Sequence, residues 1–132
     1  MKIAYIMRGV PDSGKSTVAK SIVGGAGAVH STDAYFYRDG QYQFDPSLLG
    51  EYHRKNLQAF SESVCKGIPV VICDNTNVKR EHWKPYAQVA HNAGYIVAVV
   101  TLPHPEPSAA AQRNTHNVPE HAIRRMIELW ES

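Results

Sequence analysis

Uninterrupted runs of apolar residues recur along the chain and predict its buried strands. The clearest runs span residues 3–7, 69–73 and 95–100. A run without polar interruptions is typical of a strand that is covered on both faces, as in a parallel sheet. Residues 26–30 form a weaker candidate for a fourth strand, because the glycine and alanine in this segment have little preference for extended structure.

Between these runs, hydrophobic positions recur every three or four residues, which places their side chains on one face of a helix. Three such faces are Leu49, His53, Leu57, Phe60 and Val64; Trp83, Tyr86, Ala87 and Ala90; and Ile123, Met126, Ile127 and Trp130. Pro46–Ser47 and Pro119–Glu120 suit the first turns of the first and last of these helices. Strands that alternate with helices predict an α/β fold with a largely parallel sheet and right-handed crossovers.

Length and composition are those of one folded domain over residues 1–132. The chain is 43% hydrophobic and 20% charged, which is close to the globular average and far from disordered compositions. Its net charge of +2 is too small to indicate a nucleic-acid or membrane partner by itself. Cys65 and Cys73 match neither a metal nor a redox motif, which favours free thiols in a reducing compartment. With no apolar run long enough for a signal peptide or membrane span, we expect a cytoplasmic protein without a membrane partner.

A phosphate-binding motif follows the first predicted strand. Residues 9–16 read G-V-P-D-S-G-K-S, match the pattern G-x-x-x-x-G-K-[ST] and open a helical segment. In such a loop, backbone N–H groups bind phosphates, Lys15 reaches the β and γ phosphates, and the Ser16 hydroxyl ligates Mg²⁺. We expect ATP and Mg²⁺ here, with nucleotide contacts from Gly9, Asp12, Ser13, Gly14, Lys15, Ser16 and Thr17. The alternative, a chance glycine turn with a surface lysine, is disfavoured by the flanking strand and helix.

Asp12 is an unusual residue inside this loop. Related loops usually have glycine at this position, and a carboxylate there would repel a bound phosphate. Aspartate still tolerates the left-handed backbone conformation that such a position requires. From the sequence we slightly favour a harmless side chain that points to solvent.

Acidic residues follow the second and third predicted strands, and ligands of open α/β sheets bind at those carboxyl ends. Asp33, within residues 31–36, is our candidate general base, placed to take a proton from an acceptor hydroxyl beside the γ phosphate. Its alternative role is to cap the next helical turn. Asp74 begins a polar segment, residues 74–77, where a carboxylate supports the metal ion. An Asx turn before the following helix is a compatible structural role for this segment.

Arg113 begins another polar segment, residues 113–119, between an alanine-rich helical stretch and the last predicted helix. We expect this segment to form a lid. From a lid, an arginine would stabilise the charge on a transferring phosphoryl group, because its planar donors suit phosphate oxygens. The alternative is an ordinary surface arginine.

Four segments together resemble a known kinase family: residues 9–17, 31–36, 74–80 and 113–119. They are similar to the P-loop kinases related to 5′-hydroxyl polynucleotide kinases, in the zeta-toxin and AAA-type group of small P-loop kinases. The resemblance covers nearly the whole chain and implies a three-layer P-loop NTPase sandwich, with a central four-stranded sheet and a helical lid. The positions that match the family's functional residues are Lys15 and Ser16 of the P-loop, Asp33, Asp74, the lid residue Arg113, and Arg38 as the contact to a phosphate of the acceptor strand.

We therefore predict a kinase that uses ATP and Mg²⁺ to phosphorylate the 5′-hydroxyl of DNA or RNA, at a single-stranded or frayed end. Lys15, Asp33 and Arg113 would be its catalytic residues, and Arg38 would bind the acceptor with Asp33. Two alternatives stay open. One is a small-metabolite or nucleoside kinase, which needs a closed acceptor pocket. The other is a nucleotide-binding regulator without transfer, which Asp12 favours.

Aromatic residues and histidines in these segments are less diagnostic. Five aromatic residues surround Arg38 and would stack on nucleobases, although loop packing explains them nearly as well: Tyr35, Phe36, Tyr37, Tyr42 and Phe44. The seven histidines lack the spacing of an H-E-x-x-H metal site. His116 is of interest because it lies in the predicted lid.

Overall fold

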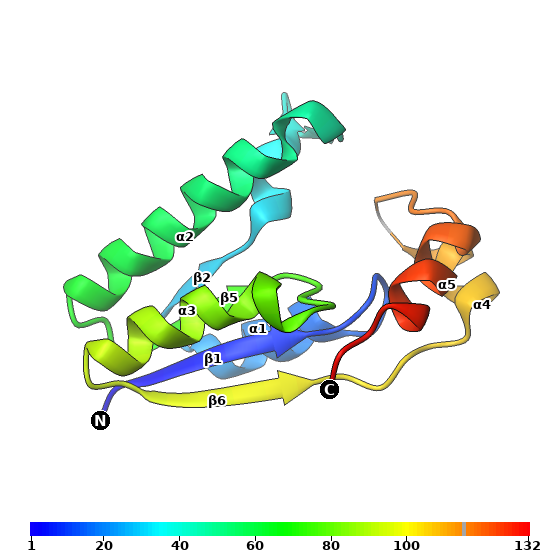
Figure 1. Cartoon of the computed structure of the whole chain (residues 1–132). Helices are drawn as coiled ribbons and strands as arrows, with labels where there is room; N and C mark the ends of the chain where they lie inside the picture. The colour runs from blue at the N-terminus through cyan, green and yellow to red at the C-terminus, as the bar shows by residue number, and fades with distance from the viewer. Residues whose placement is uncertain (115) are drawn as a thin grey trace.

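Four parallel strands form the central sheet of the molecule. The computed structural model describes residues 1–114 and 116–132. The strands of the sheet are β1 (Ile3–Arg8), β2 (Ala28–His30), β5 (Val70–Asp74) and β6 (Ile96–Thr101), in the order β2-β5-β1-β6 (Figure 1). In this order β1 is an interior strand, and Ile6 pairs with Cys73 of β5 and Val99 of β6. The parallel four-stranded sheet predicted from the sequence is confirmed.

Helices cover both faces of this sheet. They are α1 (Lys15–Val23), α2 (Leu49–Cys65), α3 (Arg80–Asn92), α4 (Pro107–Arg113) and α5 (Glu120–Glu128). Along β1, Ala4 and Ile6 join a core cluster with α2 and α3, whereas Tyr5 and Met7 join a second cluster with α1. Because successive strand side chains point to opposite faces, α1 lies on one side of the sheet and α2 and α3 on the other (Figure 1). The three-layer α/β sandwich is thereby confirmed.

Two boundaries differ from those that the sequence predicts. The strand expected over residues 26–30 begins only at Ala28. Gly27 is the reason, since a Cβ there would stand 2.4 Å from the carbonyl oxygen of Val23, so the chain is still in a tight turn at this point. The helix expected from Pro46 opens as a short 3-10 helix, η2 (Pro46–Leu48), before α2 begins.

A 3-10 helix and a small hairpin connect β2 to η2, and the sequence analysis predicts neither. The 3-10 helix is η1 (Thr32–Phe36), and the hairpin consists of β3 (Tyr37–Arg38) and β4 (Gln41–Tyr42). Asp39 and Gly40 form its turn, with left-handed φ values of 53° and 78°. The hairpin lies with the start of α2 above the carboxyl end of the sheet (Figure 1).

The helices α4 and α5 form the predicted helical lid. They contact each other through the buried side chains of Ala110 and Ile123, which pack with Val10 of the P-loop. Both helices lie beyond the carboxyl ends of β1 and β6, in orange and red in Figure 1. Trp130, expected on the helical face of α5, lies past its end but packs against the same cluster. Among the described helices, none has the length and apolar character needed to cross a membrane.

A buried arginine fastens the end of the chain to the first strand. Arg8 is only 3% exposed, and its guanidinium lies 5.4 Å from the ring centre of Trp83 and 4.6 Å from that of Trp130. It donates hydrogen bonds to the backbone carbonyls of Asn77, Val78 and Glu131. Because three carbonyls share one guanidinium, the residues that follow α5 are held beside the strand that leads into the P-loop.

Candidate active site

The P-loop connects β1 to α1 and has the backbone geometry of a phosphate cradle. At Gly9 an added Cβ would clash with the hydroxyl oxygen of Ser13, so a larger residue there would have to displace the Ser13 side chain. Asp12 and Gly14 have left-handed φ values of 66° and 91°. Turns with such residues form concave groups of N–H donors that bind anions. Lys15 begins α1, and the partial positive charge of a helix N-terminus adds to this preference for phosphate.

Ser16 and Asp74 meet beside the P-loop and suit a magnesium ion. The Ser16 hydroxyl donates to Oδ2 of Asp74 over 2.9 Å. Asp74 is the last residue of β5 and is 7% exposed, and its Oδ1 atom has no hydrogen-bond partner among residues 1–114 and 116–132. A buried carboxylate oxygen that lacks a donor, next to a serine hydroxyl, is the donor set that holds Mg²⁺ and its waters in P-loop enzymes.

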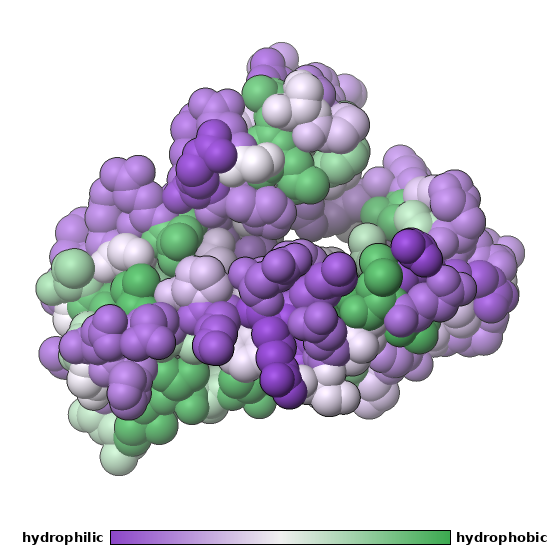
Figure 2. Space-filling model, in the orientation of Figure 1, coloured by the Kyte–Doolittle hydropathy of each residue, from purple (hydrophilic) through white to green (hydrophobic). Residues whose placement is uncertain are grey.

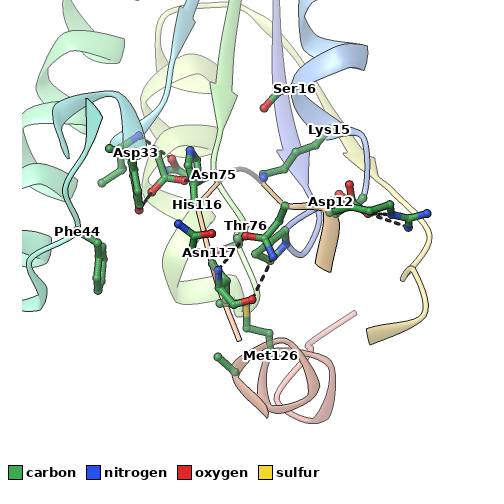
Figure 3. A pocket seen from close by; sticks show the side chains of 18 of the residues that line it. Asp12, Lys15, Ser16, Asp33, Phe44, Asn75, Thr76, His116, Asn117 and Met126 are labelled. Atoms are coloured by element: carbon green, nitrogen blue, oxygen red, sulfur yellow. Dashed lines mark hydrogen bonds and ion pairs between the residues drawn. The ribbon is translucent and has the colours of Figure 1, made fainter. Parts of the chain in front are cut away.

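A cavity of about 690 Å³ extends from the P-loop to η1 and the hairpin, at the carboxyl end of the sheet. Residues of the P-loop, η1, the hairpin, the start of α2, the β5–α3 connection and the lid line it. The surface is hollowed between the hairpin region and the lid (Figure 2). Lys15 extends into the cavity from one side, and Asp33 and Asn75 lie on the other (Figure 3). The structure therefore brings the predicted residues Lys15, Ser16, Asp33 and Arg113 to one cavity.

Asp33 lies in the first turn of η1 with its carboxylate 40% exposed. The hydroxyl of Tyr42 donates to Oδ1 over 3.1 Å, and Nδ1 of His116 lies 3.4 Å from Oδ2. Burial and the charge of Asp33 both raise the pKa of Tyr42, so its hydroxyl remains a donor at neutral pH. The N-cap position of η1 belongs to Ser31, so Asp33 does not take the alternative role of a capping residue.

The polar segment after β5 fixes the position of η1 relative to the sheet. Oδ1 of Asn75 accepts a hydrogen bond from the backbone N–H of Thr32 over 2.9 Å. Asn77, with a left-handed φ of 50°, donates from its side chain to the carbonyl of Met7 over 2.8 Å. Asp33 therefore belongs to a helix that is tied to the ends of β5 and β1, next to the P-loop. Both side chains bond to distant segments of the chain, so neither bond is the local Asx turn considered from the sequence.

Asp12 forms an ion pair with the lid arginine. Its Oδ2 atom lies 2.8 Å from Nη2 and 2.9 Å from Nε of Arg113, in the last turn of α4. The side chain of Asp12 is 26% exposed and is held in this ion pair, so it does not point freely into solvent as the sequence slightly favoured. The paired guanidinium offsets the carboxylate charge at the phosphate cradle and keeps Arg113 at the P-loop.

Arg38 lies outside the main cavity. It is exposed on β3 and lines an adjoining groove of about 350 Å³ together with Phe36, Phe44 and Tyr52. Its Nη2 atom donates to the Tyr52 hydroxyl over 3.4 Å. Phe44 borders both hollows, so the groove continues from the acceptor side of the cavity. The structure thus places Arg38 beside the site but not among Lys15 and Asp33.

Two side chains of the site have roles that the sequence analysis did not assign to them. Tyr42 reaches Asp33 because the hairpin pairs it with Tyr37, and the Asp39–Gly40 turn is the signal that predicts such a hairpin. His53 fits the helical face of α2 by its spacing, yet it lines the cavity. Its Nδ1 atom and the Thr32 hydroxyl share a hydrogen bond of 3.0 Å. Burial lowers the pKa of His53, which favours its neutral form.

Segments of several curated proteins are similar in sequence to this chain. Human NEDD4-binding protein 2 is 37% identical over an alignment of 134 positions, which covers 98% of this chain and 8% of that protein. The 2′,3′-cyclic-nucleotide 3′-phosphodiesterase of Pongo abelii is 30% identical over 110 residues, covering 75% of this chain and 24% of that protein. The chain thus spans a small part of the proteins that it matches.

Two solved structures have the same fold. A gluconokinase from Sinorhizobium meliloti matches with a TM-score of 0.63 and 22% identity, covering 98% of this chain and 75% of the kinase. A sugar kinase from Janibacter matches with a TM-score of 0.63 and 17% identity, over 100% of this chain and 79% of the other. At such low identity, the likeness establishes a P-loop kinase fold and nothing finer.

The family of the chain follows from a match over nearly its whole length. The model of the AAA domain family AAA_33 matches residues 5–131. This range contains the P-loop, the Asp33 and Asp74 positions, and the lid with Arg113. The chain therefore belongs to the AAA_33 family, with the fold of a small P-loop kinase.

Proposed function

We propose that the chain transfers the γ phosphate of ATP to the 5′-hydroxyl of a polynucleotide. One observation carries the proposal: Asp33 lines the same cavity as Lys15 and Ser16, opposite the phosphate cradle. A nucleotide-binding regulator needs the cradle alone, whereas group transfer also needs a base for the acceptor hydroxyl. The kinase fold of the chain supports phosphoryl transfer in general.

Each residue of the site has a role in this reaction. The P-loop N–H groups and Lys15 bind the phosphates, and Ser16 and Asp74 hold Mg²⁺. When bound, Mg²⁺ neutralises charge on the β and γ phosphates. Asp33 orients the acceptor hydroxyl and takes its proton. Arg113 exchanges the Asp12 carboxylate for the transferring phosphoryl group, whose oxygens its donor fork fits.

The surroundings of Asp33 support a polynucleotide as the acceptor. Tyr37 and Phe44 are 48% and 52% exposed, so both rings are accessible to a ligand. Bases of single strands stack on such side chains, and Arg38 lines the adjoining groove together with Phe44, where it can bind a backbone phosphate. The relative that acts on 2′,3′-cyclic nucleotides agrees with a nucleotide-type acceptor.

A small-metabolite kinase is the second candidate, favoured by one observation. His116 of the lid lies 3.4 Å from Asp33, so the lid reaches over the acceptor side as a small hydroxyl substrate would require. The cavity of about 690 Å³ lies within the usual size of small-molecule sites, roughly 300 to 1,000 Å³.

A panel of acceptors separates these functions. The chain is incubated with γ-labelled ATP, Mg²⁺ and one acceptor at a time: DNA or RNA oligonucleotides with a 5′-hydroxyl, the same oligonucleotides with a 5′-phosphate, nucleosides, and sugars. We expect label on the 5′-hydroxyl oligonucleotides and none on their 5′-phosphate controls. Label on nucleosides or sugars alone would establish the second candidate. ATP hydrolysis without any labelled acceptor would contradict both.

A further inference from the structure

The carboxylate of Asp33 contacts a lid residue that the reaction above leaves without a role. Nδ1 of His116 lies 3.4 Å from Oδ2 of Asp33, and Nε2 lies 3.2 Å from the hydroxyl of Tyr37. The imidazole also stacks on the ring of Tyr42, with ring centres 4.0 Å apart and planes 18° from parallel. The His116 side chain is 24% exposed. Two aromatic side chains of the hairpin and the Asp33 carboxylate therefore hold this one imidazole.

The chemistry of these groups gives each contact a direction. Tyr42 donates its hydroxyl to Oδ1 of Asp33, and Tyr37 can donate to Nε2 of a neutral His116. The proton of the imidazole then lies on Nδ1, facing Oδ2 of Asp33. At 3.4 Å the pair is longer than an ordinary hydrogen bond, and catalytic contacts of this kind tighten in the substrate complex.

The lid segment that presents His116 is itself braced. The side-chain amide of Asn114 donates to the carbonyls of Ala110 and Val118, over 2.9 and 3.1 Å, and its oxygen accepts from the N–H of Val118 over 2.8 Å. Asn117 has a left-handed φ of 56°, as the tight return of the chain toward α5 requires. Thr115, between these residues, lies outside the described part of the chain. These hydrogen bonds fix the position of the lid segment that contains His116.

We propose that His116 is a positioning residue for Asp33, which orients the carboxylate toward the acceptor hydroxyl when the lid is closed. The inference rests on the proposed function, since it identifies His116 as the residue that positions the proposed general base, Asp33. It also couples the lid to both substrates, because Arg113 and His116 lie on the same lid and reach the phosphate side and the acceptor side respectively.

Asp33 can accept the proton of the acceptor hydroxyl while its contacts with Tyr42 and His116 persist. The acceptor O–H bond breaks as its oxygen bonds to the γ phosphorus. The bond from that phosphorus to the β–γ bridging oxygen breaks, and its electron pair leaves with ADP. The acceptor proton passes to Asp33. A carboxylate offers about four lone-pair positions, so Tyr42 and His116 occupy two of them and one of the others accepts this proton. His116 keeps its own proton throughout.

Three substitutions at one position test the role. In His116→Asn the amide nitrogen takes the place of Nδ1, whereas in His116→Gln it takes the place of Nε2; His116→Ala removes both. We expect Ala and Gln to lower kcat for the acceptor by about ten- to a hundred-fold, the usual cost of losing a group that orients a reacting residue, and Asn to retain most of the activity. The Kd for ATP should stay unchanged in all three. His121→Ala, at an exposed histidine of α5, is the matched control and should behave as wild type.

A spectroscopic readout on the unliganded chain accompanies the kinetics. The ¹⁵N chemical shifts of the His116 ring report which nitrogen carries the proton. In the wild type we expect the proton on Nδ1. We expect these shifts to change in Asp33→Asn but not in Asp39→Asn. Equal loss of kcat in the Asn, Gln and Ala variants, or loss of ATP affinity in step with kcat, would overturn the inference and leave the proposed function standing. A His116 ring that does not respond to Asp33→Asn would also overturn it. A wild-type chain that labels no acceptor would instead overturn the proposed function.

Discussion

At the scale of single residues, Asp12 distinguishes this P-loop from a cradle made only of backbone and lysine. Its carboxylate reaches a guanidinium 101 positions away, and the pair is partly exposed. Exposed ion pairs contribute about 0 to 1 kcal/mol, so a nucleotide phosphate, with its greater charge, exchanges readily for Asp12. Asp12 therefore holds the lid arginine at the P-loop. In the proposed reaction, its negative charge also opposes the phosphate that replaces it.

Asp12→Gly should bind ATP more tightly than the wild type. Two unit charges about 4 Å apart in water interact by about 1 kcal/mol, so removing the carboxylate predicts an increase in affinity of about five-fold, measured by calorimetric titration. Asp39→Gly is the matched control, because Asp39 also has a left-handed backbone, with φ of 53° against 66° for Asp12, but lies in the hairpin turn. Relief of backbone strain is common to both variants. Weaker ATP binding in Asp12→Gly, or the same gain in both, would contradict this role of Asp12.

At the scale of elements, the position of the lid depends on contacts at both of its ends. Ala110 and Ile123 join α4 and α5 to Val10 of the P-loop. Beyond α5, Arg8 binds the Glu131 carbonyl between the rings of Trp83 and Trp130. Arg8 is the last residue of β1, the strand that leads into the P-loop, and it also holds the segment that follows α5. We therefore expect the stability of α5 to depend on Arg8.

Arg8→Lys should destabilise the chain and loosen α5. An ammonium cannot reach three carbonyls with the planar fork of a guanidinium, so we expect the free energy of unfolding to fall by about 2 to 4 kcal/mol and the α5 amides to exchange hydrogen faster. Denaturant titration and hydrogen exchange measure the two effects. Arg124→Lys is the control, since Arg124 forms an exposed 2.7 Å pair with Glu120. A loss of stability no larger than that of the control would rule out the anchoring role.

Elements with a regular hydrophobic pattern could be predicted from the sequence, and short ones could not. The apolar runs of β1, β5 and β6 and the spacings of α2, α3 and α5 correspond to observed elements within a few residues. The β3–β4 hairpin has two-residue strands with mostly exposed side chains, so it has no hydrophobic periodicity, and only its Asp39–Gly40 turn marks it.

At the scale of the whole molecule, the sheet topology explains which parts of the site could be predicted. Lys15, Asp33 and Asp74 follow or end parallel strands, so a parallel sheet must bring them to one edge. Contacts across the lid depend instead on how α4 and α5 return over that edge. For this reason the Asp12–Arg113 pair and the His116–Asp33 contact have no local signal in the sequence.

The measurement that tests the account most directly is phosphoryl transfer by Asp33→Asn. The amide keeps the shape of the side chain and an oxygen for the Tyr42 hydroxyl but has little capacity to take a proton. We predict that transfer of label from γ-labelled ATP to a 5′-hydroxyl oligonucleotide falls by about 10²- to 10⁴-fold, while the Kd for ATP and the behaviour of the Asp39→Asn control stay unchanged. Transfer at the wild-type rate by Asp33→Asn would contradict the claim that this carboxylate makes the P-loop domain a kinase.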